Sequence, residues 1–579
     1  MLELHEPTPR KVTRRGRRGQ PAALVQIPVW GGVLSLPSPS AAPPEVTDVP
    51  GGDGLRDLLA GLNREQLRAV THGDGPLLVV AGAGTGKTQV ITRRIAWLIA
   101  TRRAKPSEIL ALTFTDQAAD EMQTRVDQLV PYGYTDTAIS TFHAFGDRLL
   151  REFALELGLP TDLRVLSRPE TVVFLRERVF ELGLDEYRPL GDPTKFLDAL
   201  ATLFSRAKDE DVSPDAFLVH AHALAEAAAV AIEAAEADPR ADREAALAQA
   251  EEARRRLELA SAYGSYQRLL AAHGAVDFGD QVSLALRLLR ESPVARETVQ
   301  RRFKYLLVDE FQDTNRAQAE LVALVAQRHR NVTVVGDDDQ SIYKFRGAAI
   351  SNILEFRERY RAARVVVLRR NYRSRAPILD ASYRLVRHND PDRLEVRAGI
   401  VKRLIATRKG KAAAPVRHEA FATGTEEADW IAKDIARRIS EGAAARDMAV
   451  LVRSNAAADP VLRSLNLEGI PWRFSGTSGL YARPEVKLLL SFLRAVADPG
   501  SSVDVYALAA SELYGLGGED LAGIVQMARR RNRSVLEVLE ELGRQPGILR
   551  LAPQTRTAAA RLVADLGRFT ALAHERPAG

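Results

Sequence analysis

The sequence predicts an α/β protein built on parallel β-sheets, into which helical segments are inserted. The first observation is a short, continuous apolar run, Leu77–Val80, which passes through a glycine-rich stretch into a helical pattern from Gln89 to Ile99. Strands buried on both faces of a parallel sheet have this uninterrupted apolar character. The second observation is that similar runs recur and end in polar clusters, at residues 109–113, 305–308 and 332–335. Ligands bind at the carboxyl edge of such sheets, so we expect the functional residues there.

Composition restricts the class of protein. The chain has 579 residues, of which 46% are hydrophobic and 27% are charged, as in a globular protein of several domains. The formal net charge of +6 permits nucleic-acid binding without requiring it. The absence of cysteine excludes disulfides, thiol catalysis and cysteine-ligated metals, and it fits a reducing cytoplasm. We find no run of about eighteen uncharged apolar residues and therefore expect no membrane span.

The sequence pattern changes several times along the chain. Residues 1–54 contain a basic cluster and many Pro, Gly, Ser and Ala residues, which predicts a disordered tail. Alternating strand-like and helical patterns cover residues 55–150 and 275–364, and the helical stretch 151–274 separates them. A second set of strand-like runs predicts another α/β unit over 365–500, followed by helices over 501–579. The runs of that second set are Val365–Leu368, Val416–Phe421, Met448–Val452 and Pro471–Phe474.

The most specific motif is AGAGTGKT, which lies between the first predicted strand and its helix. Glycines allow the backbone to wrap around a phosphate, and the amide groups of the loop and of the helix N-terminus point at it. Lys87 would bind the β- and γ-phosphates, and Thr88 would offer its hydroxyl group to Mg²⁺. The sequence therefore predicts a nucleotide site. Its members are Ala81, Gly82, Ala83, Gly84, Thr85, Gly86, Lys87 and Thr88.

Two adjacent carboxylates, Asp309 and Glu310, follow the apolar run at 305–308. Asp309 is placed to hold Mg²⁺ through water, and Glu310 to polarise an attacking water molecule as a general base. Adjacent acids at a strand end favour a hydrolase, because a kinase has to keep water away from the transferred phosphate. Together with the phosphate loop, the pair predicts hydrolysis of a nucleoside triphosphate.

These and further motifs, in this order, resemble those of the UvrD/Rep/PcrA-type superfamily 1 DNA helicases. AGAGTGKT looks like motif I, and LLVDEFQDTN at 306–315 looks like motif II. VVGDDDQSIYKFRGA at 334–348 is similar to motif III. The remaining matches are Leu62-Asn63 with Gln66 (Q motif), Thr113–Thr115 (Ia), Thr141–Phe145 (Ib), LRRNYRS at 368–374 (IV) and GIPWRFSG at 469–476. The resemblance covers residues 55 to about 500.

The resemblance implies P-loop, RecA-like motor domains with inserted all-helical subdomains. The first motor domain would comprise residues 55–150, with the ATP site, and 275–364, with 151–274 as its helical insertion. Residues 365–500 would form an incomplete second motor domain, and 501–579 would begin a second helical accessory subdomain. The family's motifs V and VI are not found from Ser475 to Gly579. We therefore expect the chain to stop inside that accessory insertion.

The resemblance also implies roles for individual residues around ATP. Gln66 would recognise adenine, and Tyr372 would stack on it. Gln340 would sense the γ-phosphate and link it to the DNA groove. Arg373 would reach the γ-phosphate from the second motor domain and act as an arginine finger.

For DNA, the resemblance implies contacts from Phe114, Thr141, His143 and Phe345. Aromatic faces stack on any base, by about 1–3 kcal/mol per base, which suits a motor that has to grip every sequence. Taken alone, Phe114, Phe345 and His143 would more often be structural. The motif context favours the DNA role for Phe114 and Phe345, and it leaves both readings open for His143. Asp116-Gln117 departs from the Asn-Lys usual in the family, and a carboxylate there should weaken contact with a phosphate backbone.

Three functions remain open from the sequence. The first is a bacterial cytoplasmic, ATP- and Mg²⁺-dependent 3′–5′ helicase or translocase that acts on single-stranded and partly duplex DNA in repair, replication or recombination. The second is a protein that binds ATP and single-stranded DNA but does not unwind efficiently, because its second motor domain is incomplete. The third is the helicase portion of a larger helicase–nuclease. Protein partners are unknown. We expect weak unwinding or none from this length of chain.

Overall fold

The structure is a computed structural model that describes residues 52–130, 137–160, 162–237, 242–342, 351–408, 415–474, 484–545 and 547–575. The chain divides into two compact units, one up to Val416 and the other from Arg417 onward. The tail expected over 1–54 lies outside the described residues up to 51, as does Phe345. Helix α1 (Gly52–Leu59) begins inside the predicted tail, three residues before the expected start of ordered structure.

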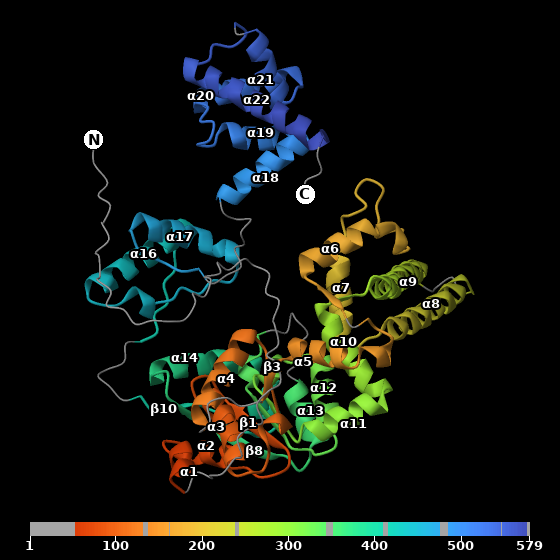
Figure 1. Cartoon of the computed structure of the whole chain (residues 1–579), viewed down its shortest axis with the longest axis vertical. Helices are drawn as coiled ribbons and strands as arrows, with labels where there is room; N and C mark the ends of the chain where they lie inside the picture. Colours follow the sequence, from red (N-terminus) through yellow and green to blue (C-terminus); the bar gives the residue numbers. More distant parts are fainter. Residues whose placement is uncertain are drawn as a thin grey trace, which may run out of the picture. The chain divides into compact units, whose positions relative to one another are not determined.

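The first unit is built on a six-stranded parallel sheet with the strand order β3-β2-β6-β7-β1-β8. This confirms the predicted α/β class and the parallel sheet. Figure 1 labels β1, β3 and β8 of this sheet. The four runs named first in the sequence analysis are β1, β2, β6 and β7. The strands are β1 Leu77–Ala81, β2 Ile109–Thr113, β3 Ala138–Thr141, β6 Tyr305–Val308, β7 Val332–Gly336 and β8 Arg364–Leu368.

Strand β8 corrects the predicted division of the chain. The run Val365–Leu368 was expected to open a second α/β unit, but it pairs in parallel with β1, from Leu77 opposite Arg364 to Ala81 opposite Leu368. It therefore closes one edge of the first sheet. The physical reason is that β1 buries both faces and offers its free edge to the next apolar run along the chain.

The two faces of the sheet are covered by different helices, which explains the uninterrupted apolar strands. Alternate residues of β1 belong to two hydrophobic clusters: Leu77 and Val79 to one, Leu78 and Val80 to the other. The first cluster includes helices α2 Arg64–Val70, α3 Lys87–Ala100 and α4 Asp116–Leu129. The second includes α5 Phe142–Glu152, α10 Phe278–Glu291, α11 Pro293–Arg302, α12 Arg316–Ala326 and α13 Ser351–Arg359.

Helices inserted between α5 and α10 form a hydrophobic cluster of their own, in which Phe204 stacks on Tyr263 and Tyr266. A short parallel pair of strands, β4 and β5, flanks the inserted helices. The bounds are β4 Arg164–Leu166, α6 Arg168–Glu177, α7 Leu197–Asp209, α8 Pro214–Ala237, α9 Arg243–Ala272 and β5 Ala275–Asp277.

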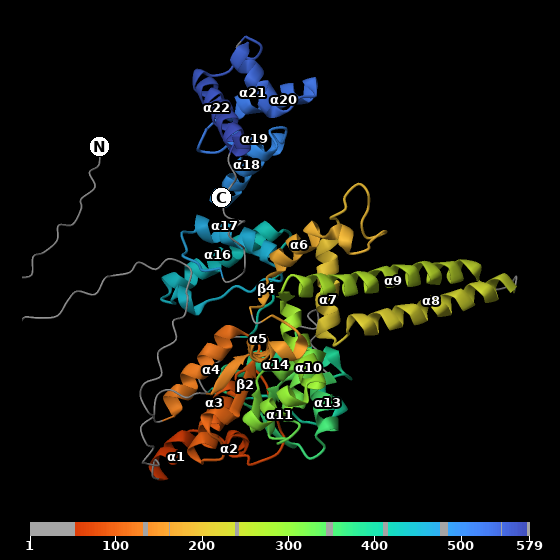
Figure 2. The same ribbon diagram turned by 45° about the vertical axis from the view of Figure 1, so that its right-hand side comes forward.

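Helices α8 and α9 lie side by side as a long antiparallel pair (Figure 2). Five of their buried alanines recur every seventh residue, at 221 and 228 in α8 and at 246, 253 and 260 in α9, and Ala262 of α9 is buried as well. Among the described residues, α8 is also the one helix that is long and apolar enough to cross a membrane by length and composition, although only 11% of its apolar window is buried. One such helix is weak evidence for a membrane span, and the expectation that the chain has no membrane span stays a prediction.

After β8 the chain forms a small structure beside the phosphate loop. Strands β9 (Arg370–Asn371) and β10 (Ile405–Ala406) pair in parallel. Between them lie α14 (Ala376–Val386) and α15 (Leu394–Arg397). All four elements belong to the first compact unit.

The second unit contains helices and irregular segments, and no strand, among its described residues. Its helices are α16 Gly424–Ser440, α17 Ala458–Leu467, α18 Pro484–Ala497, α19 Ser502–Ala509, α20 Gly518–Arg531, α21 Val535–Arg544 and α22 Pro553–Glu575. The strands expected at 416–421, 448–452 and 471–474 are not formed, although all three segments are described. No described segment pairs with them, and side chains such as Leu451 stay exposed. This part of the prediction is wrong.

Candidate active site

The phosphate loop connects β1 to α3 at the carboxyl edge of the sheet. Gly84 and Gly86 adopt φ values of +71° and +89°, in the left-handed region that favours glycine. Thr85 is fully buried, and its hydroxyl group donates to the carbonyl oxygen of Gly82 at 2.7 Å. Lys87 is the first residue of α3, so its side chain starts at the helix N-terminus. The loop therefore has the shape of an anion cradle, as AGAGTGKT predicts.

Gln66 forms a side-chain hydrogen bond to this loop. Its Nε2 donates to the carbonyl oxygen of Thr85 at 3.0 Å, and its Oε1 accepts from the backbone N–H of Asn63 at 3.1 Å. A Cβ atom at Gly86 would lie 2.7 Å from Gln66 Nε2, and the φ of +89° at this position is one that other residues rarely adopt. Gln66 is buried at the N-terminus of α2, where it completes a capping box. Its recognition of adenine stays a prediction.

The segment that follows β8 covers the other side of the loop. Asn371, which the sequence analysis did not single out, donates from Nδ2 to the carbonyl oxygen of Ala83 at 2.5 Å. The backbone N–H of Tyr372 donates to Gly84 at 2.9 Å, and the Tyr372 hydroxyl accepts from Asn63 Nδ2. A Cβ atom at Gly84 would lie 2.6 Å from Cβ of Arg373. The structure thus brings Tyr372 and Arg373 to the phosphate loop, and it places them in the first compact unit rather than in a second one.

Lys87 is one member of a ring of hydrogen-bonded polar residues. Its ammonium group donates to Glu310 Oε2 at 2.5 Å and to Gln340 Oε1 at 3.2 Å. Gln312 Nε2 donates to the same Glu310 oxygen at 2.8 Å, and Gln312 Oε1 accepts from the backbone N–H of Asp337 at 3.0 Å. Gln340 Nε2 donates to Asp337 Oδ2 at 2.8 Å, which closes the ring. Lys87 is therefore in direct contact with Glu310 and with Gln340, which are also predicted for catalysis.

Asp309 lies at the end of β6 and is almost fully buried. Burial, and next the neighbouring Glu310, raise the pKa of the Asp309 carboxyl group to about 7, while Lys87 acts in the opposite direction. Two carboxylates thus share one lysine, and a divalent cation would offset the remaining negative charge. Among the described residues, no group of three or more His, Cys, Asp or Glu side chains could hold a metal alone.

A run of three aspartates, Asp337–Asp339, adjoins Gln340 and is bound by two basic side chains. Lys402 Nζ lies 2.9 Å from Asp337 Oδ1 and 2.7 Å from Asp339 Oδ2, and it also contacts Asp338. Arg393 forms two hydrogen bonds to Asp339, at 2.7 and 2.8 Å. Neither cation stands out in the sequence. Their separation from the aspartates by more than 50 residues leaves no local signal for them.

The residues predicted to contact DNA lie at the ends of two neighbouring strands. Thr113 of β2 pairs with Thr141 of β3. Phe114, which comes directly after β2, and Thr141, which ends β3, therefore lie at the same carboxyl edge of the sheet. Thr141 caps α5, and its hydroxyl group accepts from the backbone N–H of Ala144. His143 meets Phe278 edge-on, with ring centroids 6.1 Å apart.

His143 is half-buried. Burial lowers its pKa, and Asp116 acts in the opposite direction. Asp116, the departure noted in the sequence, therefore lies close enough to influence His143 electrostatically. Phe114 and His143 are half-buried, whereas Thr141 is buried, and the contact of each with DNA stays a prediction.

Comparison with known proteins identifies the relatives of this chain. Residues 62–361 match the model of the UvrD/REP helicase N-terminal domain, and residues 366–541 match the UvrD-like helicase C-terminal domain. The chain belongs to the UvrD/REP helicase family. This confirms the resemblance inferred from its motifs.

Two relatives show how far the likeness extends. The chain is 32% identical over 489 residues to the ATP-dependent DNA helicase PcrA of Staphylococcus epidermidis, an alignment that covers 84% of this chain and 61% of the relative. With PcrA of Staphylococcus aureus it shares 31% over 488 residues, which is 84% of this chain and 60% of the relative. The chain thus spans about three fifths of the length of these helicases.

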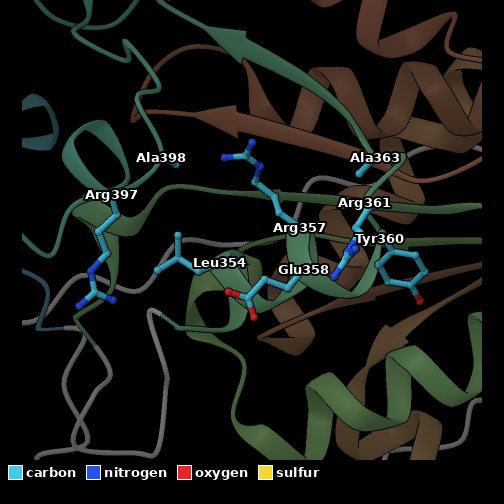
Figure 3. A pocket seen from close by; sticks show the side chains of 8 residues that line it. All are labelled: Leu354, Arg357, Glu358, Tyr360, Arg361, Ala363, Arg397 and Ala398. Atoms are coloured by element: carbon cyan, nitrogen blue, oxygen red, sulfur yellow. The ribbon is translucent and has the colours of Figure 1, made fainter.

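A pocket elsewhere in this family member contains none of the predicted site residues. It has a volume of about 620 Å³ and lies between α13 and α15 (Figure 3). Three arginines line it, Arg357, Arg361 and Arg397, together with Glu358 and the buried Tyr360. Arg397 is paired with Asp392 at 2.6 Å. The residues predicted to bind the nucleotide therefore do not line this cavity.

Proposed function

We propose that the chain is the motor portion of an ATP-dependent DNA helicase that moves 3′ to 5′ along single-stranded DNA and unwinds duplex DNA in repair, replication or recombination. The observation that supports this most is the contact of Lys87 with both Glu310 and Gln340 beside the phosphate loop. That array brings a phosphate-binding cation, a general base and a polar sensor to one place. The bacterial cytoplasm is the proposed compartment.

Each residue of the array has a chemical task. The ammonium group of Lys87 has three donors, so it can keep Glu310 and Gln340 while the third binds a phosphate oxygen. Glu310 would accept a proton from the attacking water, and Gln312 holds its carboxylate at 2.8 Å. Thr88 and Asp309 would hold Mg²⁺, which when bound neutralises phosphate charge. Arg373 would add a second cation at the γ-phosphate.

The proposed DNA surface fits a motor that is indifferent to sequence. Phe114 and His143 would stack on bases, and Thr141 would position the loop that precedes α5. Such contacts use ring faces rather than base edges, so they bind all four bases with similar strength. The partner would be single-stranded DNA next to a duplex.

The test is ATP hydrolysis by the purified chain with and without single-stranded DNA. We expect DNA to stimulate turnover, and we expect Lys87→Ala to abolish it, because the phosphates lose their cation. The exposed Lys105, changed to Ala, is the matched control and should leave turnover unaltered.

Two outcomes would contradict the proposal. Unchanged turnover in Lys87→Ala would remove the site assignment. Binding of both ATP and single-stranded DNA without any hydrolysis would instead identify a binding protein. Strand separation is measured on a duplex with a 3′ or a 5′ single-stranded tail, and faster unwinding of the 5′-tailed substrate would refute the proposed polarity.

A further inference from the structure

We propose that Lys402 is a positioning residue for ATP turnover, which holds the turn Asp337–Gln340 so that the Gln340 side chain stays on Lys87. Lys402 belongs neither to the phosphate loop nor to the pair of carboxylates Asp309 and Glu310. It would act without touching ATP. The inference rests on the proposed function, because it assigns Lys402 a part in that same hydrolysis.

The contacts of Lys402 support this role. Its side chain is 5% exposed, and its ammonium group meets one oxygen from each of Asp337, Asp338 and Asp339. All three donors of the ammonium group are thereby used within the protein. A lysine so deeply buried and so fully bonded fixes the positions of its partners, because leaving any of these carboxylates unpaired would be costly.

Asp337 passes this constraint to the nucleotide site. One of its oxygens, Oδ1, binds Lys402 at 2.9 Å, and the other, Oδ2, accepts from Gln340 Nε2 at 2.8 Å. The opposite end of the Gln340 amide, Oε1, accepts from Lys87. The orientation of the Gln340 amide is therefore set by Asp337, and that of Asp337 is set in part by Lys402.

Charge balance explains why Lys402 is needed in this cluster. Lys402 and Arg393 are the cations that pair with the three aspartates, and Arg393 is also paired with Asp390 and Glu395. Removal of Lys402 would add one uncompensated negative charge to a buried turn in which carboxylates already outnumber these two cations, and the aspartates would repel one another. Arg393 holds only Asp339 among them, so Asp337 would lose its cation.

The segment that contains Lys402 also touches the phosphate loop. Leu404 packs on Gly82, where an added Cβ atom would lie 2.8 Å from the Leu404 side chain. Gly82, Gln340, Lys402 and Leu404 line one cavity of about 150 Å³. The same three-residue stretch therefore contacts the loop that would bind phosphate and the turn that would sense it.

The experiment compares Lys402→Met with the unmodified chain in DNA-stimulated ATP hydrolysis. We expect kcat to fall on the order of 10²-fold, as for a small misplacement of a catalytic group. KM for ATP should change little, because the phosphate loop and Lys87 are intact. The exposed Lys105, changed to Met, gives the control for loss of a lysine charge, with kcat unaltered.

Hydrogen exchange of the peptide spanning residues 332–342 provides a second measurement that does not need activity. Lys402→Met should accelerate exchange in this peptide and leave β1 and β6 protected. The double variant Lys402→Met/Asp338→Asn restores the original charge balance, so it should slow that exchange again and recover part of kcat.

The outcomes separate the two proposals. An unmodified chain without ATP turnover contradicts the proposed function, while exchange at 332–342 still tests Lys402. Normal kcat and normal exchange in Lys402→Met overturn the positioning role. A change confined to KM, or exchange accelerated throughout the first unit, overturns it as well, since the former indicates a binding role and the latter general support of the fold.

Discussion

Strand β1 in the first unit and the run Met448–Val452 in the second are both short, apolar and rich in β-branched or aliphatic residues, yet only β1 forms part of a sheet. Leu77–Ala81 has a paired strand on each side, and all five residues are buried. In the second run, Leu451 is 95% exposed, and Val450 and Val452 are also exposed. Similar residues therefore have opposite environments.

The difference teaches that an apolar run specifies a strand only when partners are available on its edges and faces. β1 lies between β7 and β8, and its side chains alternate between two helical layers. Strand preference largely measures fit to such a half-buried, paired surface. The run at 448–452 has no paired strand among the described residues, so it does not form a strand in spite of its apolar composition.

The largest effect is expected in the buried sheet. Leu78→Ala removes a side chain that is fully enclosed between β1 and its helices, and should lower the free energy of unfolding of the first unit by about 2–5 kcal/mol. Urea unfolding followed by hydrogen exchange in peptides from residues 77–81 measures this. A loss below about 1 kcal/mol would show that the site collapses without cost and would weaken the contrast.

An intermediate effect is expected at β9, a strand of two residues that depends on side-chain bonds. Asn371 is buried; its Oδ1 accepts from the backbone N–H groups of Arg373 and Ser374, and its Nδ2 donates to Ala83. Asn371→Ala would leave these groups unpaired, at about 1–3 kcal/mol of local stability.

The measurement for Asn371→Ala is KM for ATP together with exchange at residues 370–374. Both should rise, because the segment that covers the phosphate loop opens more often. The exposed Asn455, changed to Ala, is the control. Unchanged exchange in Asn371→Ala would show that the backbone pairing of β9 suffices alone.

The smallest effect is expected in the exposed run. Leu451→Ala makes the same change as Leu78→Ala, but it should alter the free energy of unfolding by no more than about 0.5 kcal/mol. The same urea and exchange measurements apply, now on peptides from residues 445–455. A loss comparable to that at Leu78 would mean that Leu451 is enclosed in solution, and the contrast between the two regions would fail.

The sequence predicted those parts of the fold in which burial is continuous along the chain. β2 and β6 match their predicted ranges, and β1 and β7 extend theirs by one residue. These strands are recognisable because both of their faces are buried, so nearly every residue in them is apolar. β3, with the sequence AIST, is half polar and partly exposed, so it gave no such signal. β8 was found as a strand, but its sheet depends on pairing with β1, which composition does not encode.

The candidate site was predictable where function requires a fixed local spacing. Lys87 follows a glycine loop, and Glu310 follows a strand, so each stands out in the sequence. Lys402 and Asn371 do not, because their roles come from contacts with residues 65 and 288 positions away. Such partners are specified by the fold as a whole.

The seven-residue spacing of the buried alanines in α8 and α9 gives this pair of helices a unit of length. Seven residues are close to two helical turns, about 10.5 Å along the axis. Adding or removing seven residues in each helix would return alanines to the shared interface. The far end of the pair could thereby be moved outward or inward in regular steps, while the aromatic stack of Phe204, Tyr263 and Tyr266 near its base stays unchanged.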